Sequence, residues 1–267
     1  MASPGQLPAD GTTDQPDHLV ADYSSQDGTD SDGDSALALH MLFTLTFDGK
    51  LLNCPVTSPR RVLDAGTGTG VWAIDYAEDH PDSQVVGIDL SPTQPDFVPP
   101  NLTFYIDDIE DPWTFSYKFD LIYGRMLTGS VRDWPKFIKQ SYDNLESGGW
   151  IELADILLQL RSDDNTIPEG CASAKWGDLM LEAAAKFGAP LDSCTSWPRD
   201  PKYKEMGLWN YENLGNGASG LSLALFTRAL GWTPEEVEVF LVDVRKDMKN
   251  KNIHGWWPIH VVYGRKP

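Results

Sequence analysis

Cysteine is scarce in this chain of 267 residues. Its three cysteines, Cys54, Cys171 and Cys194, lie far apart, and no C-x-x-C pair or Cys/His cluster accompanies them. An odd number of scattered thiols provides neither a disulfide framework nor a zinc site. We therefore expect no metal site and a reducing cellular compartment.

Long apolar runs are missing as well. No stretch approaches the roughly 20 apolar residues that a membrane helix requires. The amino-terminal segment has neither the basic start nor the apolar run of a secretory signal. We therefore expect no membrane partner, and a location in the cytoplasm, the nucleus or both.

Basic residues are far fewer than acidic residues in this chain. The chain carries 21 Lys and Arg against 40 Asp and Glu, which gives a formal net charge of −19. Such a chain repels phosphate groups, so direct binding to nucleic acid is not expected. Residues 1–35 hold no Lys or Arg and few large apolar side chains, and the acidic run 27–34 lacks the closing Glu of a calcium loop. We predict that 1–35 is a disordered acidic tail.

Short apolar runs alternate with helical patterns from Arg61 onward, after an apolar segment at 36–47 that is expected to form a short helix. Strands are predicted at 61–65, 84–89, 102–106, 119–123 and 150–158, and helices at 71–78 and about 132–145. Strands that alternate with helices across short loops indicate an α/β fold with a mostly parallel sheet, covered on both faces.

The second half of the chain is mainly helical in pattern. Helices are predicted at 172–187, 201–213, 220–230 and 234–249. Thr233 and Glu236 form a capping signature that marks the start of the last helix. We expect one domain over 36–267, in which a helical cap at about 197–250 precedes a terminal strand at 256–264.

A glycine-rich run joins the first predicted strand to its helix, Asp64-Ala65-Gly66-Thr67-Gly68-Thr69-Gly70. Glycine permits positive φ and a close approach to a ligand, and the helix N-terminus adds free amides. Dinucleotide enzymes use the spacing G-x-G-x-x-G, whereas the spacing here is G-x-G-x-G. The acidic Asp64 before the glycines favours S-adenosylmethionine (SAM), whose amino-acid end carries an ammonium group.

Two further acidic elements follow the second and third strands. Asp89 ends the second strand, where a carboxylate can accept hydrogen bonds from ribose hydroxyls, and its neighbour Leu90 is included in the predicted cofactor site. Past the third strand, Asp107 or Asp108 can accept a hydrogen bond from an adenine amino group while Ile109 packs on the ring. The alternation of side-chain direction along the strand favours Asp108. Each acidic residue can equally be a cap or a loop charge. Together, at the carboxyl ends of strands, they indicate a SAM site.

Several longer runs are more particular than the glycine loop. They are VLDAGTGTGVWAIDYA (62–77), DLSPTQPDFVPPN (89–101), DDIEDPWTF (107–115), GSVRDWPKFIKQSYDNLESGGWIEL (129–153), GLSLALFTRALGW (220–232) and VVYGRKP (261–267). Through these runs, residues 61–267 resemble the fungal SAM-dependent methyltransferase family of the secondary-metabolism regulator type, which has velvet-complex-associated relatives. The resemblance implies a Rossmann-like class I methyltransferase sheet with an antiparallel last strand, SAM as cofactor, and a helical insertion that caps the substrate side.

Two departures from the family accompany this resemblance. Relatives carry a stretch rich in Tyr, Arg and Glu before the region 42–51, and here only Tyr23 corresponds to it, so the lid over SAM is expected to be shortened. The chain also passes from 190–196 directly to 197–201, without residues for the usual sixth strand. We therefore expect that the sheet lacks this edge strand and exposes the antiparallel last strand instead.

No motif identifies a catalytic residue. Tyr123 and Arg125 follow the fourth strand, where the methyl group of SAM should point, although Tyr123 can equally belong to the core. His254 is a candidate base by its chemistry alone, whereas His260 lies in the terminal strand and favours a structural role. Five tryptophans of the cap either line an aromatic pocket for an apolar acceptor or form core. They are Trp197, Trp209, Trp232, Trp256 and Trp257.

The sequence thus predicts SAM-dependent methyl transfer to a small metabolite, at an oxygen atom. The alternative is a weakly active or inactive methyltransferase-like regulatory subunit that acts through protein–protein contacts, which the shortened lid favours. A dinucleotide oxidoreductase is disfavoured by the glycine spacing. The expected partners are a small-molecule acceptor and a regulatory protein.

Overall fold

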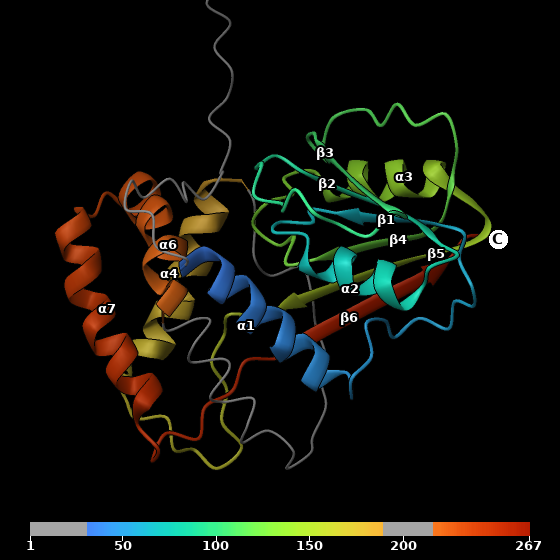
Figure 1. The fold of residues 1–267 in the computed structure, drawn as a ribbon. Coiled ribbons are helices and arrows are strands. Elements are labelled where there is room, and N and C mark those ends of the chain that lie inside the picture. Colours follow the sequence, from blue (N-terminus) through green and yellow to red (C-terminus); the bar gives the residue numbers. More distant parts are fainter. Residues whose placement is uncertain (1–30, 189–215) are drawn as a thin grey trace, which may run out of the picture.

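A six-stranded sheet forms the centre of the computed structural model, which describes residues 31–188 and 216–267 (Figure 1). The strands are β1 Arg61–Ala65, β2 Gln84–Asp89, β3 Leu102–Ile106, β4 Phe119–Arg125, β5 Leu145–Ile156 and β6 Ile259–Arg265. They lie in the order β3-β2-β1-β4-β5-β6. Neighbouring strands are parallel except β5 and β6, which are antiparallel. The α/β fold expected of a class I methyltransferase sheet is therefore confirmed.

Helices cover both faces of the sheet and gather beyond the carboxyl ends of its parallel strands (Figure 1). They are α1 Ser31–Thr46, α2 Val71–Asp79, α3 Trp134–Asn144, α4 Ala172–Lys186, α6 Asn216–Leu225, the π-helical turn η3 Phe226–Leu230 and α7 Pro234–Lys249. Helices α4, α6 and α7 form the cap, and α1 lies between the cap and α2. None of the helices within the described ranges is long and apolar enough to cross a membrane.

The central strands are buried on both faces, because side chains that alternate along a strand point to opposite sides of the sheet. On one face, Val62 of β1 belongs to a core cluster with Trp72 of α2. On the other face, Leu63 belongs to a second cluster with Phe137 of α3. The two adjacent apolar residues of β1 therefore belong to two different cores.

Helix α7 begins where its capping signature predicts. The Thr233 hydroxyl accepts a hydrogen bond from the Glu236 backbone amide at 3.2 Å, and the Glu236 carboxylate accepts one from the Thr233 amide at 2.8 Å. Two amides that the helix itself cannot satisfy are thereby paired. The predicted helix at 234–249 is confirmed.

Helix α1 begins earlier than the apolar pattern indicates. It starts at Ser31, inside the segment predicted as tail, while 1–30 lie outside the described residues. Its carboxyl-terminal half buries Leu42 and Phe43 in a core cluster shared with the cap helices. Tertiary packing of this kind supplies most of a helix's stability.

The expectation that the sheet lacks its sixth strand requires correction. The sheet has six strands, and the sixth in chain order, β6, is the predicted antiparallel terminal strand at the edge of the sheet; it pairs with β5 at seven positions, from Trp150 opposite Arg265 to Ile156 opposite Ile259. This pairing supplies the backbone hydrogen bonds that the outer edge of β5 would otherwise lack. The segment 189–215, which contains the stretch behind the expectation and the predicted helix at 201–213, lies outside the described residues.

Candidate cofactor site

The loop from β1 to α2 turns through three glycines with positive φ. The angles are +71° at Gly66, +56° at Gly68 and +82° at Gly70, a region that side chains disfavour. Two of the glycines are also tightly packed. A Cβ at Gly66 would overlap Leu127, which follows β4, and a Cβ at Gly70 would overlap the ring of Phe104 on β3. These two apolar residues, which no sequence motif indicated, determine why those positions must be glycine.

Gly68 is different, because its open side faces empty space. A Cβ placed there would meet no heavy atom within 4 Å. The bare backbone at the tip of the loop therefore leaves room for a ligand to approach closely. This cradle lies at the carboxyl ends of the strands, where open α/β sheets bind their ligands.

Three amides in the first half of the loop are not free for a phosphate group. The amides of Gly66 and Thr67 both donate to the carbonyl of Ile88, at 2.9 and 3.0 Å. The amide of Gly68 donates to Asp89 Oδ2 at 2.8 Å. A pyrophosphate would need these donors and would meet the Asp89 carboxylate instead. The geometry fits a nucleoside cofactor without phosphates, such as SAM, and disfavours a dinucleotide.

Asp64 lies buried beside this cradle, at the end of β1, with only 2% of its surface exposed. Its Oδ2 accepts a hydrogen bond from the Thr67 hydroxyl at 2.6 Å. Burial raises the pKa of this carboxyl to about 6, against the opposing effects of the Thr67 hydrogen bond and the Arg125 charge. A buried carboxylate gains strongly from a cationic partner, and the ammonium group of SAM can provide one.

Asp89 is oriented by two backbone amides. Its Oδ2 accepts from Gly68 and its Oδ1 accepts from Ser91 at 2.9 Å. Each carboxylate oxygen can accept a further hydrogen bond, so the group stays able to take ribose hydroxyls. The neighbouring Leu90 is 43% exposed and lies at the same strand end.

The segment after β3 lies next to Asp89, since the amide of Asp107 donates to the Asp89 carbonyl at 3.0 Å. Asp108 Oδ1 accepts the Glu110 amide at 2.8 Å and so stabilises a turn. Ile109 is buried in the core cluster between the sheet and α3. The structure brings these residues to the cofactor edge, and their contact with adenine remains a prediction.

Tyr123 lies in the core. Its ring stacks on Trp72 of α2 with centroids 3.9 Å apart and planes 11° apart, and 1% of its surface is exposed. Burial raises the pKa of the phenol, and its hydroxyl has no hydrogen-bond partner among the described residues. This placement favours the structural interpretation of Tyr123 over the catalytic one.

The two candidate histidines lie on other parts of the domain. His254 is exposed, with Nδ1 2.6 Å from Asp164 Oδ2 and its amide donating to the Thr166 hydroxyl. The His254 hydrogen bond holds the pKa of Asp164 well below its usual range. These contacts tie His254 to the loop between β5 and α4 rather than to the glycine loop. His260 is buried in β6, opposite Asp155.

Arg125 does lie at the cofactor edge, where it is held by residues that no motif revealed. Its Nη1 is 3.2 Å from His40 Nδ1, and its Cζ is 5.1 Å from the ring centroid of Phe43. Both partners belong to α1. His40 Nε2 lies 2.9 Å from Asp75 Oδ2 of α2. Helix α1 is thus tied both to the end of β4 and to the helix that follows the glycine loop.

The tryptophans of the cap pack against one another and against phenylalanines. Trp232 lies 5.3 Å from Phe226 and 5.5 Å from Phe240, and Trp257 lies 6.5 Å from Trp176, measured between ring centroids. Such edge-to-face contacts are typical of a core. Of the predicted aromatic pocket, Trp197 and Trp209 lie outside the described residues.

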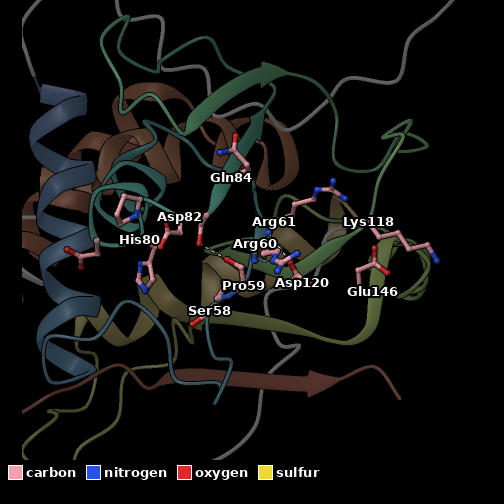
Figure 2. A pocket seen from close by; sticks show the side chains of 13 residues that line it. Ser58, Pro59, Arg60, Arg61, His80, Asp82, Gln84, Lys118, Asp120 and Glu146 are labelled. Carbon is pink, nitrogen blue, oxygen red and sulfur yellow. Dashed lines mark hydrogen bonds between the residues drawn. The ribbon is translucent and has the colours of Figure 1, made fainter.

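A separate hollow of about 750 Å³ opens at the opposite, amino ends of the strands (Figure 2). Its lining is polar and includes Arg61, Gln84, Lys118, Asp120 and Glu146, which lie at or near the starts of β1, β2, β4 and β5. Because ligands of open α/β sheets bind at the carboxyl ends, we do not assign this hollow to the cofactor.

Comparisons with known proteins agree with this geometry. The family described as "Methyltransferase domain" matches residues 40–212. The methyltransferase pytC of Aspergillus terreus is 34% identical over 256 residues, which cover 86% of this chain and 79% of that protein. The secondary metabolism regulator LAE1 of Cochliobolus heterostrophus is 33% identical over 260 residues, 85% of each chain.

Among solved structures, coclaurine N-methyltransferase bound to N-methylheliamine and S-adenosylhomocysteine (SAH) aligns with a TM-score of 0.51 at 15% identity. The alignment covers 86% of this chain and 72% of that one. At this identity the likeness concerns the fold alone. The family match, the relatives and the glycine loop lead to one conclusion: the chain belongs to the methyltransferase domain family and is a SAM-dependent methyltransferase.

Proposed function

We propose that the protein transfers the methyl group of SAM to a small metabolite, at an oxygen atom. The observation that carries this proposal is the turn after β4. Met126 adopts a φ of +56°, which is strained for a residue with a side chain, and its amide donates to the Ala154 carbonyl at 2.9 Å. Met126 packs against the apolar cluster of the cap, whereas the next residue, Leu127, packs under Gly66.

This turn connects the cofactor loop directly to an apolar wall. The cap cluster shared by α1, α4 and α7 has partly exposed apolar neighbours, among them Leu39, Met126 and Leu225. Small-molecule sites are lined mainly by apolar side chains with a few polar groups. An apolar acceptor held between the cap and the glycine loop would lie close to the cofactor.

Three acidic residues would hold the cofactor. Asp64 would attract its ammonium group, Asp89 would accept from its ribose, and Asp108 would accept from its adenine. When bound, the cofactor supplies an electrophilic methyl group on a sulfonium. The chain's own contribution is to fix the acceptor beside that group and to exclude water, since positioning alone supplies a large part of many rate enhancements.

The acceptor class can be tested by isotope transfer. Purified protein is incubated with SAM labelled in its methyl group and with an extract of small fungal metabolites, and the label is then followed by size. We expect label in small organic products, whose methylated atom is identified by NMR as a methoxy group. Label found only in protein, including the enzyme itself, would contradict the proposal. The Gly68→Arg variant serves as the control without cofactor binding.

The pH dependence of cofactor binding tests the role of Asp64. Only the ionised carboxyl attracts an ammonium group, so affinity for SAH should be full above the raised pKa of about 6. It should fall about tenfold for each further unit of acidification below that value. Calorimetric titrations between pH 5 and pH 8 measure this slope.

The matched control for this titration is Asp64→Asn. It preserves the shape of the side chain and the acceptor for Thr67, but it removes the charge. The variant should bind SAH more weakly at pH 8 and without the acid slope. Burial also raises the pKa of Asp155 to about 6, and this carboxyl is present in both proteins. Equal slopes in both would therefore assign the pH dependence to another group.

The second candidate function is a regulatory subunit that works through protein contacts. It is supported by relatives whose names state regulation, such as LAE1 and the secondary metabolism regulator laeA of Aspergillus fumigatus, which is 32% identical over 93% of this chain. A third relative, from Emericella nidulans, is named protein-methionine methyltransferase laeA. In the isotope experiment, little or no label in small products, from a protein that still binds SAH, would favour this candidate.

A further inference from the structure

Arg125 and Asp64 project from the same face of the sheet, at the same end. Asp64 pairs in register with Tyr123 of β4, and registered neighbours share a face. Arg125 stands two residues beyond Tyr123, so it returns to that face at the carboxyl end of its strand. The charge of Arg125 is close enough to lower the pKa of Asp64. A fixed cation and a buried carboxylate thus stand side by side at the cofactor edge.

The contact with His40 orients Arg125 without neutralising it. A guanidinium has only donors, so Arg125 must donate to His40 Nδ1. The hydrogen of His40 then lies on Nε2, which donates to Asp75. In this arrangement His40 is a neutral imidazole, consistent with the lowering of its pKa by burial and by Arg125. The positive charge of Arg125 therefore remains available.

No described carboxylate forms an ion pair with Arg125 within 4 Å. The side chain is half-buried, since α1 covers it with His40 and the ring of Phe43. A partly buried guanidinium is stabilised by an anionic partner whose two oxygens accept hydrogen bonds from its planar N–H donors. The structure supplies the donors, and a ligand can supply the carboxylate.

We propose that Arg125 receives the carboxylate of the cofactor's methionine end, while His40 of α1 acts as the positioning residue that aims it. This inference rests on SAM binding. The methionine end is a zwitterion, and the edge offers one group for each of its charges, Asp64 for the ammonium and Arg125 for the carboxylate. Helix α1 then takes part in cofactor recognition, although the sequence indicated a shortened lid.

The test compares two ligands that differ only at the amino-acid end. SAH carries the complete zwitterion, whereas 5′-methylthioadenosine keeps the nucleoside and lacks both charges. We expect Arg125→Gln to weaken binding of SAH by roughly tenfold to a hundredfold, the range for a lost hydrogen bond to a charged group. Binding of 5′-methylthioadenosine should remain unchanged. Calorimetry on the purified full chain measures both affinities.

Substitutions at His40 test the positioning role. His40→Gln retains an acceptor for Arg125 and a donor for Asp75, so it should keep most of the affinity for SAH. His40→Leu removes both and should lose affinity for SAH but not for 5′-methylthioadenosine. Arg245→Gln is the matched control, because Arg245 is a half-buried arginine of α7 that contacts Ser219 in the cap. It should leave both affinities unchanged.

Each outcome separates this inference from the assignment of the cofactor. A wild-type protein that binds neither ligand would contradict SAM binding itself. A wild-type protein that binds both, with Arg125→Gln weakening both equally or neither, would overturn the role of Arg125 alone.

Discussion

Replacing Gly68 by arginine is expected to abolish cofactor binding while the fold persists. The φ of +56° makes a side chain cost about 1–2 kcal/mol of stability, which a folded domain of this size can tolerate. A Cβ at this position meets no protein atom within 4 Å, so the long side chain would extend into the space reserved for the ligand. Titration with SAH should show an affinity reduced by at least about a hundredfold, while the melting temperature falls only slightly.

A matched glycine controls for backbone strain. Gly170 lies in the loop between β5 and α4, with a φ of +78°, and a Cβ placed there would also meet no heavy atom within 4 Å. Gly170→Arg should therefore lose about as much stability as Gly68→Arg but bind SAH normally. Normal binding by Gly68→Arg would mean that the cofactor does not lie against this glycine.

The substitution Gly177→Ala is expected to destabilise the protein strongly, although alanine is the better helix former. Gly177 lies inside α4, and a Cβ there would overlap the carbonyl oxygen of Leu158. That oxygen also accepts the Trp257 indole N–H at 3.2 Å. Moving α4 away to relieve the overlap would disturb this hydrogen bond and the cap core, at a cost of about 2–4 kcal/mol. The higher helix propensity of alanine offsets only about 1 kcal/mol of this destabilisation.

The same substitution on an exposed helix position isolates the propensity effect. Gly220 is exposed in α6, and Gly220→Ala should stabilise the protein by about 0.5–1 kcal/mol. Urea unfolding compares the two variants with the wild type. If Gly177→Ala proves as stable as Gly220→Ala, then α4 does not depend on close contact with Leu158.

Local patterns located most of the sheet. The strands at 61–65, 84–89 and 102–106 have the predicted bounds. The fifth strand was predicted from Trp150, but β5 starts at Leu145. The pair Gly148-Gly149 resembles a turn in the sequence, whereas in the sheet the pairing with β4 shifts register between Phe119 and Leu121. Such an irregularity depends on the partner strand, which the local sequence does not contain.

The residues of the candidate site were likewise only partly predictable from the sequence. The glycine loop, Asp64 and Asp89 were identified from strand ends and spacing, and the structure brings these elements together. The catalytic candidates were less predictable, because a tyrosine or histidine has the same local signature in a core as in a site. Stacking on Trp72 decided the environment of Tyr123, and the pairing with Asp164 decided that of His254.

By itself, the sequence determined the class of cofactor and the position of its loop, because glycine spacing, strand-end carboxylates and helix caps are properties of a few consecutive residues. Only the tertiary structure decided what surrounds that loop. Phe104 and Leu127 enforce its glycines, and His40 joins Asp75 and Arg125 across separations of 35 and 85 residues. Contacts over such distances follow from how the elements pack, and no local pattern encodes them.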